Sequence, residues 1–434
     1  MRIRIEKLVY GGEGLAHHDG KTLFVPFVLP GEEIDVEILE QTKKFDRGQV
    51  TQVLERSPNR TLPRCPHFGV CGGCDYQHIS YDAQLELKEQ VLRDTLRRIG
   101  RIDWGGPITI HRSPPWEYRN RAQWKVRPSG PRSQPDGAET HSIGYFRARS
   151  SVLCPVETCS IVSPALLATF HKLRGAVADG ALPPGLREIE AFVDAAGRDL
   201  LLSATCSSLP RHAEPLLKAF SDVLPAAKTI LLRDAAGERM SLLGPGFLQY
   251  EVLGRSFRVG HLSFFQINRF LVDEMATTVG NLAGAGELAF DLYAGVGLFA
   301  ATLADHSSQV LAIEADPAAA RDLEYITLSS GGTITAHNKS AGAFLRHWKQ
   351  GRQARTPDVV VVDPPRAGLE DGVAEQLVTC KPAKIVYVSC DPSTLARDLA
   401  KVHSRGYTSR DIHLFDMFPQ TYHIECVVLL ERTR

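Results

Sequence analysis

Residues 286–297, GELAFDLYAGVG, decide the fold class of this chain. The apolar run up to Asp291 is typical of a buried strand, and LFAATLA, which follows Gly297, is typical of a helix. Glycines at such a turn let the backbone approach a ligand at the carboxyl end of the strand, although a tight turn without a ligand explains a lone GxG equally well. The stretch therefore predicts the first strand, turn and helix of an open α/β sheet.

The rest of the C-terminal region repeats this alternation of strand-like and helical stretches. The strand-like runs are QVLAIEA (309–315), TITAHN (333–338), DVVVVD (358–363), KIVYVSC (384–390) and IECVVLL (424–430). Strands that alternate with helices form a mostly parallel sheet with helices on both faces. We therefore expect residues 261–434 to form a Rossmann-like domain.

The first 60 residues carry a different pattern, in which apolar and polar residues alternate between glycine turns. The alternating runs are RIRIEKLVY (2–10), TLFVPFV (22–28), EEIDVEILE (32–40) and RGQVTQVLE (47–55). Short strands of this kind are most economically closed into a small β-barrel, which we expect over residues 1–60.

Residues 61–260 are expected to form a central α+β domain. They contain a cysteine cluster, a helix-like stretch at 81–100, and strand-like pieces at 122–128, 141–147 and 200–206. The segment PSGPRSQPDGAET, residues 128–140, is rich in turn formers and predicts an exposed loop.

Composition excludes several classes of protein. The chain has 434 residues, is 43% hydrophobic and 23% charged, and has a formal net charge of zero, so a basic surface for nucleic acid must be built locally. It has no apolar run of about 18 residues and no signal-like N-terminus, so we expect a cytoplasmic protein without a membrane partner. Its nine cysteines argue against a disulfide framework and for metal-binding or catalytic thiols.

Two features at the predicted carboxyl edge indicate a nucleotide cofactor. Glu314 ends the second strand, where a carboxylate can accept hydrogen bonds from ribose hydroxyls. Together with the turn Tyr293–Gly297, it resembles the S-adenosylmethionine site of Rossmann-like methyltransferases. Asn338, after the third strand, is in a position to reach an adenine, although it also fits an ordinary loop asparagine.

Three residues at the same edge are candidates for catalysis. Cys390 follows a strand and precedes a helix, whose dipole should favour the thiolate, although a buried core cysteine is the ordinary alternative. Asp363 ends the fourth strand, and Arg366 after it is expected to face a base or phosphates. Glu425 begins the last strand, where a carboxylate next to an apolar run suits a general base or lies at a solvated strand end.

These residues belong to motifs that resemble the RNA uracil-5-methyltransferases, in particular the iron-sulfur-containing 23S ribosomal RNA branch. The motifs are FFQIN (264–268), DLYAGVG (291–297), VDPPRAGL (362–369), YVSCDPSTLARD (387–398) and DMFPQTYHIE (416–425), in the order of the family. Residues 4–34 are similar to the TRAM barrel, an RNA-binding module. The resemblance implies that the protein binds RNA, and we expect it to be a monomer.

The cysteine cluster gains an interpretation from the resemblance. Cys65, Cys71 and Cys74 are spaced C-x5-C-x2-C, and the family completes a [4Fe-4S] site with a later cysteine. Cys159, which precedes Ser-Ile-Val-Ser-Pro, matches the family better than Cys154. Zinc, with His67 or His78, is the alternative metal. Radical S-adenosylmethionine proteins usually have C-x3-C-x2-C, which this spacing does not match.

The resemblance also implies a reaction. Cys390 adds to carbon 6 of a uracil, carbon 5 takes the methyl group of S-adenosylmethionine, and Glu425 removes the carbon 5 proton. Asp363 and Gln266 resemble the residues that hold the uracil edge and the cofactor. Phe264 and Phe265 are candidates for stacking on a displaced base.

The chain departs from the family at three places: Ala294 replaces a cysteine, Asp391 replaces an asparagine, and EYITLSSGG (324–332) replaces an asparagine-containing helix. Asp391 has the greatest consequence, because a negative neighbour opposes a thiolate unless it is paired. The expected substrate is 23S ribosomal RNA. The alternatives are a T-loop uridine of transfer RNA, or a non-catalytic iron-sulfur assembly factor that binds RNA.

Overall fold

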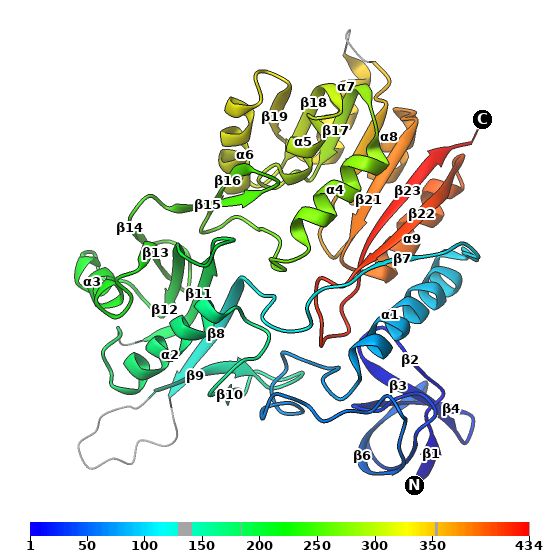
Figure 1. Cartoon of the computed structure of the whole chain (residues 1–434), viewed down its shortest axis with the longest axis vertical. Helices are drawn as coiled ribbons and strands as arrows, with labels where there is room; N and C mark the ends of the chain where they lie inside the picture. Colours follow the sequence, from blue (N-terminus) through cyan, green and yellow to red (C-terminus); the bar gives the residue numbers. More distant parts are fainter. Residues whose placement is uncertain (129–140, 184, 352–354, 434) are drawn as a thin grey trace.

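The computed structural model describes residues 1–128, 141–183, 185–351 and 355–433, and its C-terminal part is an eight-stranded sheet (Figure 1). The strand order is β19-β18-β17-β20-β21-β23-β22-β7. The strands are β7 (Thr109–His111), β17 (Gly286–Leu292), β18 (Ser307–Glu314), β19 (Ile334–Asn338), β20 (Val359–Val362), β21 (Lys384–Ser389), β22 (Tyr407–Phe415) and β23 (Glu425–Arg432). The first five in the order are parallel, and β23 is antiparallel to β21. The prediction of a mostly parallel sheet is confirmed.

Helices cover both faces of this sheet, which explains why its central strands are continuous apolar runs. The helices α4 (Val272–Ala283), α5 (Leu298–Leu303) and α6 (Pro317–Ser329) share one core with the sheet, and α7 (Ala341–Gln350), α8 (Val373–Thr379) and α9 (Pro392–His403) share the other. Within the described ranges, no helix is both long and apolar enough to cross a membrane.

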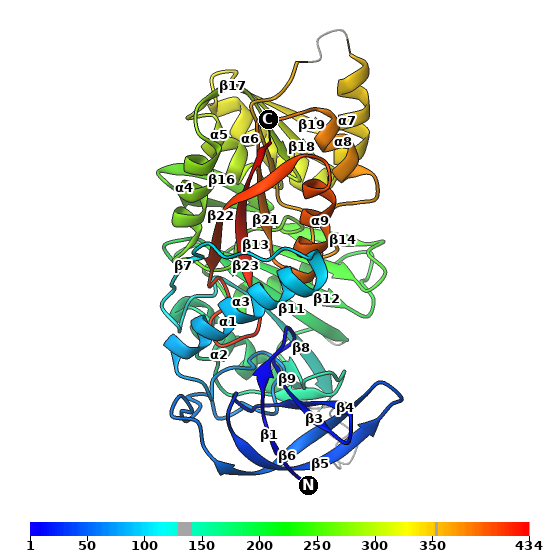
Figure 2. The same cartoon turned by 90° about the vertical axis from the view of Figure 1, so that its right-hand side faces the viewer.

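Upstream segments complete the C-terminal sheet. The three-residue strand β7 pairs in parallel with β22, and helix α1 (Tyr81–Thr95), with its continuation Leu96–Gly100, packs against α9. In two perpendicular views α1 lies between the N-terminal strands and the C-terminal sheet (Figure 2). The sequence predicts the helix but not β7, because three residues carry no periodic pattern.

The N-terminal strands form the predicted barrel. The strands are β1 (Arg2–Arg4), β2 (Lys7–Leu8), β3 (Glu13–His18), β4 (Lys21–Pro26), β5 (Glu33–Gln41) and β6 (Phe45–Glu55), in the order β1-β5-β6-β4-β3-β2. Both edges of this sheet come from one stretch, residues 2–8, so the sheet closes on itself. Buried residues such as Val25 and Ile34 fill its interior.

The central region is a seven-stranded sheet with helices against it. Its strands are β8 (Arg121–Pro128), β9 (His141–Phe146), β10 (Leu153–Pro155), β11 (Leu186–Val193), β12 (Leu200–Cys206), β13 (Ala227–Asp234) and β14 (Met240–Leu243). The helices α2 (Pro164–Ala178) and α3 (Glu214–Val223) share its core. The hairpin of β15 (Phe247–Val252) and β16 (Arg255–Gly260) packs instead in the core of α4 and α5. The predicted loop at 128–140 lies, apart from Pro128, outside the described residues.

Candidate active site

The carboxyl ends of the parallel strands bring the predicted site residues to one edge of the sheet. β17 leads into Tyr293 and the glycine turn, β18 ends at Glu314, β20 ends just before Asp363, and β21 ends just before Cys390. Because β18, β17, β20 and β21 are neighbours in this order, residues far apart in the chain become spatial neighbours. This edge is the candidate active site.

The glycine turn has the conformation that the sequence predicts. Gly295 and Gly297 have φ values of 55° and 94°, in the left-handed region that favours glycine. A Cβ atom on Gly297 would lie 2.7 Å from side-chain atoms of Leu323 and Ile326, so helix α6 also requires a glycine there. Tyr293 has a φ of 66°, and its buried hydroxyl has no hydrogen-bond partner among the described residues.

Glu314 and Asn338 are both held beside this turn. One carboxylate oxygen of Glu314 accepts from the backbone N–H of Gly295 at 2.7 Å, and the other accepts from the N–H of Asp316 at 2.7 Å. The side-chain amide of Asn338 donates to the carbonyl oxygens of Glu314 and Ala315, at 2.9 and 3.1 Å. Asn338 therefore braces the end of β18, and it can reach a ligand only through its remaining carbonyl oxygen.

Acidic groups gather at this edge. Burial raises the pKa of Asp363 to about 7. Burial and the nearby Asp363 raise the pKa of Asp291, which is fully buried, and that of Glu425, which is 4% exposed. Carboxyl groups so close together disfavour one another's ionised form. A cationic ligand beside them would favour the ionised carboxylates again. The edge is therefore suited to a positively charged ligand.

Cys390 and Glu425 are neighbours across two strands. The antiparallel register pairs Ser389 of β21 with Cys426 of β23, which places Glu425 beside Cys390. Burial, and after it the charges of Glu425 and Asp363, raise the pKa of the Cys390 thiol to about 12, while Arg366 lowers it. The thiol and a carboxylate therefore lie within reach of the same small substrate.

The expectation that the following helix favours the Cys390 thiolate is wrong. Helix α9 begins at Pro392, and the side chain of Asp391 caps it by accepting from the N–H groups of Ser393 and Thr394 at 2.8 and 3.0 Å. The positive end of the helix is thereby matched by the carboxylate of Asp391 and not by the sulfur. Asp391 is paired with this helix end, yet its charge still raises the thiol pKa.

The segment FFQIN connects the β15–β16 hairpin to α4. Gln266 is 7% exposed, and its backbone carbonyl accepts from the Asn120 amide at 3.1 Å. Of the two phenylalanines, Phe265 is 2% exposed and belongs to the core, whereas Phe264 is 65% exposed. Only Phe264 is free to stack on a base.

Two further residues lie near the site: His423, which belongs to the DMFPQTYHIE motif but for which the sequence predicts no role, and Tyr10, which carries no sequence signal. His423, two residues before Glu425, has its pKa lowered to about 4 by burial and by Arg366, so its ring is neutral. Tyr10 of the barrel contacts Tyr422 edge to face with ring centroids 5.6 Å apart, and burial together with Asp391 raises its pKa. The barrel therefore extends to the active-site edge, which strand patterns in the first 60 residues cannot reveal.

The cysteine cluster surrounds a separate cavity of about 250 Å³ in the central region. Its lining includes Cys65, Cys71, Cys74 and Cys159, together with Arg119, but not Cys154. Burial raises the pKa of Cys71 to about 12, and the charges of the other thiols add to the rise. Across the described ranges, no group of three or more His, Cys, Asp or Glu side chains is arranged to hold a metal ion.

The two histidines near this cluster have other environments. The Nε2 atom of His67 accepts from the backbone N–H of Glu157 at 3.0 Å. His78 is 2% exposed and packs against Phe27 and Phe68, and burial lowers its pKa to about 4. His67 lines the cavity with one ring nitrogen already used, and His78 does not line it.

Comparison with known proteins identifies the family. Residues 248–433 match the family described as tRNA (uracil-5-)-methyltransferase, and residues 1–51 match the TRAM domain. An uncharacterized RNA methyltransferase of Halalkalibacterium halodurans is 31% identical over 99% of this chain and 96% of its own length. One from Aquifex aeolicus is 30% identical over 99% of this chain and 98% of its own length.

A solved structure shares the whole fold. It is Pyrococcus abyssi tRNA (uracil-54, C5)-methyltransferase in complex with S-adenosyl-L-homocysteine, with a TM-score of 0.75 and 24% identity, covering 99% of this chain and 100% of that chain. The fold, the family matches and the full-length relatives all indicate an RNA methyltransferase. The chain belongs to a family of RNA methyltransferases; its C-terminal region matches the tRNA (uracil-5-)-methyltransferase model and its N-terminal region matches the TRAM domain.

Proposed function

We propose that this protein transfers a methyl group from S-adenosylmethionine to carbon 5 of a uridine in RNA, with 23S ribosomal RNA as the substrate. The observation that carries the proposal is the position of Cys390, just after β21, beside Glu425 at the start of β23 and near Asp363. A nucleophile and a base that reach one small ring are what a substitution at carbon 5 of uracil requires.

The acidic edge supports S-adenosylmethionine as the methyl donor, because this cofactor carries a sulfonium and an ammonium charge. Bound there, it supplies the electrophilic methyl group. We assign its binding to Tyr293, Gly295, Glu314 and Asn338 around the turn, and to Gln266 and Asp363 on the substrate side. The solved relative of Pyrococcus abyssi was crystallised with S-adenosyl-L-homocysteine, the demethylated form of this cofactor.

The chain's own residues account for the remaining steps. The Cys390 thiol loses its proton to water, and the thiolate sulfur forms a bond to carbon 6 of uracil. The double bond between carbons 5 and 6 breaks, and its electrons form an enolate that makes carbon 5 nucleophilic. Carbon 5 then takes the methyl group. The carboxylate of Glu425 removes the proton from carbon 5, the ring double bond forms again, and the carbon–sulfur bond to Cys390 breaks. Asp363 holds the uracil edge, and Phe264 stacks on the displaced base or its neighbour.

A second substrate has support from one observation. The solved protein with the same fold is described as a methyltransferase of uracil 54 in transfer RNA. A T-loop uridine of transfer RNA is therefore the second candidate substrate.

Methyl-labelled S-adenosylmethionine with purified protein and separate 23S ribosomal and transfer RNA tests the proposal. We expect label in 5-methyluridine of 23S ribosomal RNA, located by nuclease digestion and mass spectrometry. Label only in transfer RNA would select the second candidate, and label in neither would contradict the proposed reaction.

We further propose that residues 61–260 hold a [4Fe-4S] cluster, while residues 1–60 bind RNA and residues 261–434 carry out methyl transfer. The thiols are not gathered around a single metal position in the described residues, but four of them line one cavity, and four cysteines are the usual donor set of such a cluster. They surround a volume large enough for several atoms, which supports a cluster over a single zinc ion. The cavity lies apart from Cys390, so we assign the cluster a structural or RNA-contacting role.

The cluster proposal predicts visible charge-transfer absorbance and about four irons per chain in anaerobically purified protein. Cys159→Ser should lose both, because Cys159 lines the cavity, whereas Cys154→Ser should keep both. Stoichiometric zinc without iron would overturn the proposal. Loss of iron in Cys154→Ser but not in Cys159→Ser would show that Cys154, and not Cys159, is the fourth ligand.

A further inference from the structure

The loop of residues 416–424 leads directly into the proposed base. It connects β22 to β23, and Glu425 is the first residue of β23. Glu425 pairs with Phe415, the last residue of β22, so this pair closes the loop at both ends and a displacement of the loop is transmitted to it. The surroundings of the loop show what holds it, and the inference rests on the roles proposed above for these two residues.

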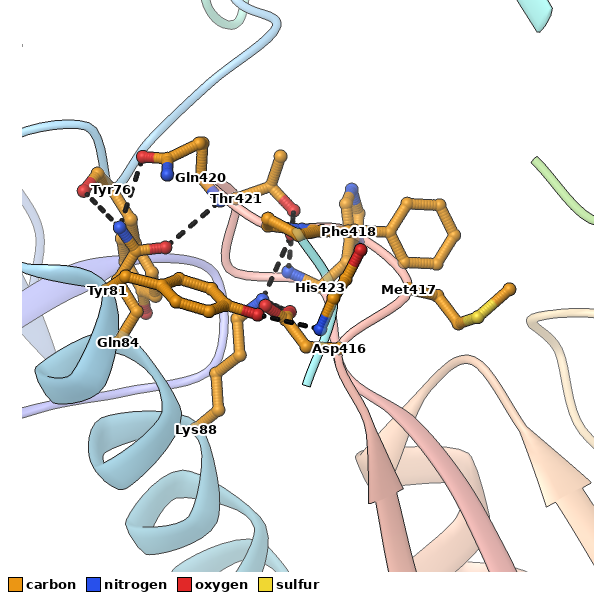
Figure 3. Close-up of polar contacts among 12 residues, drawn as sticks. Tyr76, Tyr81, Gln84, Lys88, Asp416, Met417, Phe418, Gln420, Thr421 and His423 are labelled. Carbon is orange, nitrogen blue, oxygen red and sulfur yellow. Dashed lines mark hydrogen bonds and ion pairs between the residues drawn. The ribbon is translucent and has the colours of Figure 1, made fainter. Parts of the chain in front are cut away.

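A buried ion pair holds the start of the loop. The Nζ atom of Lys88 in helix α1 donates to Asp416 at 2.6 Å and to the carbonyl oxygen of Phe418 at 3.0 Å (Figure 3). Lys88 is 1% exposed and Asp416 is fully buried. Ion pairs so deeply buried add little net stability compared with apolar packing, but separating the partners leaves uncompensated buried charges, so moving the loop away from helix α1 is costly.

A pair of glutamines holds the middle of the loop. The N–H of Gln420 donates to the side-chain oxygen of Gln84 at 3.0 Å, and the Gln84 amide donates back to the side-chain oxygen of Gln420 at 3.1 Å. The Gln84 amide also lies 2.9 Å from the carbonyl oxygen of Ile79. Gln420 has a φ of 69°, which these contacts maintain at a non-glycine residue.

The same segment of chain connects the loop to the cysteine cavity. The N–H groups of Asp75 and Tyr76 both donate to the carbonyl oxygen of Gln420, each at 2.9 Å. Asp75 directly follows Cys74, which lines the cavity. One continuous stretch, residues 74–88, thus reaches from the cavity wall to both anchors of the loop.

We propose that residues 75–88 form a positioning element that aims Glu425 at the substrate and couples it to the cysteine cavity. Gln84 and Lys88 are positioning residues, because they contact the loop and not the reacting atoms. Their loss should slow removal of the carbon 5 proton and leave the earlier addition of Cys390 in place. A merely structural role would lower all steps in proportion to the folded fraction.

Gln84→Met tests this, because methionine keeps the side-chain volume and removes the amide contacts. Turnover should fall about 10-fold or more, since a displaced general base forfeits part of its usual contribution. The fraction of protein in methylated covalent adduct with ordinary RNA should rise, as measured on denaturing gels. RNA with 5-fluorouridine should trap Gln84→Met to the same extent as wild type. Gln90→Met, an exposed position in the same helix, is the matched control.

Three results separate the ideas. Normal turnover of Gln84→Met, or equal loss of trapping and turnover in folded protein, would overturn the positioning role. If Gln84→Met does not fold, Gln84→Glu, which keeps the acceptor for the Gln420 N–H, replaces it with the same criteria. Absence of trapping in wild type would instead reject the proposed function.

Hydrogen exchange tests the coupling without measuring activity. Exchange of residues 416–424 should become faster in Cys74→Ser than in wild type, because Asp75 and Tyr76 would hold Gln420 less firmly. Cys380→Ser, at the end of α8, is the control and should leave this exchange unchanged. Unchanged exchange in Cys74→Ser that has lost its cluster would overturn the coupling.

Discussion

Cys390→Ala is expected to abolish methyl transfer to RNA, lowering turnover by about 10⁴-fold or more, because no other step makes carbon 5 nucleophilic. It should also abolish the covalent adduct with 5-fluorouridine RNA, since fluorine cannot leave carbon 5 as a proton does. The adduct is measured as a shifted, RNase-sensitive band on denaturing gels and located by peptide mass spectrometry.

Cys380→Ala is the control for this experiment, because Cys380 is a partly buried thiol at the end of α8. It should form the adduct and turn over as wild type does. An adduct that persists in Cys390→Ala would show that Cys390 is not the nucleophile. The proposed reaction at this edge of the sheet would then lack its first step.

Glu425→Gln is expected to lower turnover by about 10²- to 10⁴-fold, the usual contribution of a general base. Addition and methyl transfer do not need this carboxylate, so a methylated adduct with ordinary RNA should accumulate. The labelled methyl group should then migrate with the protein on denaturing gels. Glu431→Gln, on the same strand and partly exposed, should behave as wild type. Full turnover by Glu425→Gln would assign the base elsewhere.

The same variant tests the electrostatics of the site. The charge of Glu425 is, after burial, the largest cause of the raised Cys390 pKa. Removing a negative charge favours the thiolate, so the pKa of Cys390 should fall in Glu425→Gln. Alkylation of Cys390 by iodoacetamide should therefore begin at lower pH than in wild type. An unchanged pH profile would contradict the closeness of the two groups.

The sequence predicts the strand ends well, because apolar runs that alternate with helices indicate a mostly parallel sheet, whose parallel strands all end at the same edge. The glycine turn, Glu314, Asp363 and Cys390 all follow such runs, and the structure brings them to one edge. Glu425 directly precedes an apolar run, so the sequence also predicts that it lies at the end of a strand. The register that places it beside Cys390 is not visible in the sequence, because the loop of residues 416–424, which leads into β23, carries no periodic pattern.

Other features depend on contacts between distant segments. YDAQLELKEQ is recognisable only as a helix, and nothing in it indicates that Gln84 and Lys88 contact residues more than three hundred positions away. The expectation that helix α9 favours the Cys390 thiolate is wrong because the side chain of Asp391 caps this helix, which the sequence alone does not reveal. Tyr10 reaches the site from the barrel, and that too requires the packing of domains.

The central claim, that this protein makes 5-methyluridine in RNA, is tested most directly by mapping that nucleotide in ribosomal and transfer RNA from a deletion strain. Complementation with wild type and with Cys390→Ala completes the comparison. We predict loss of 5-methyluridine from 23S ribosomal RNA in the deletion strain, restored by wild type and not by Cys390→Ala. If the deletion strain keeps wild-type levels of 5-methyluridine at every site in ribosomal and transfer RNA, the central claim is contradicted.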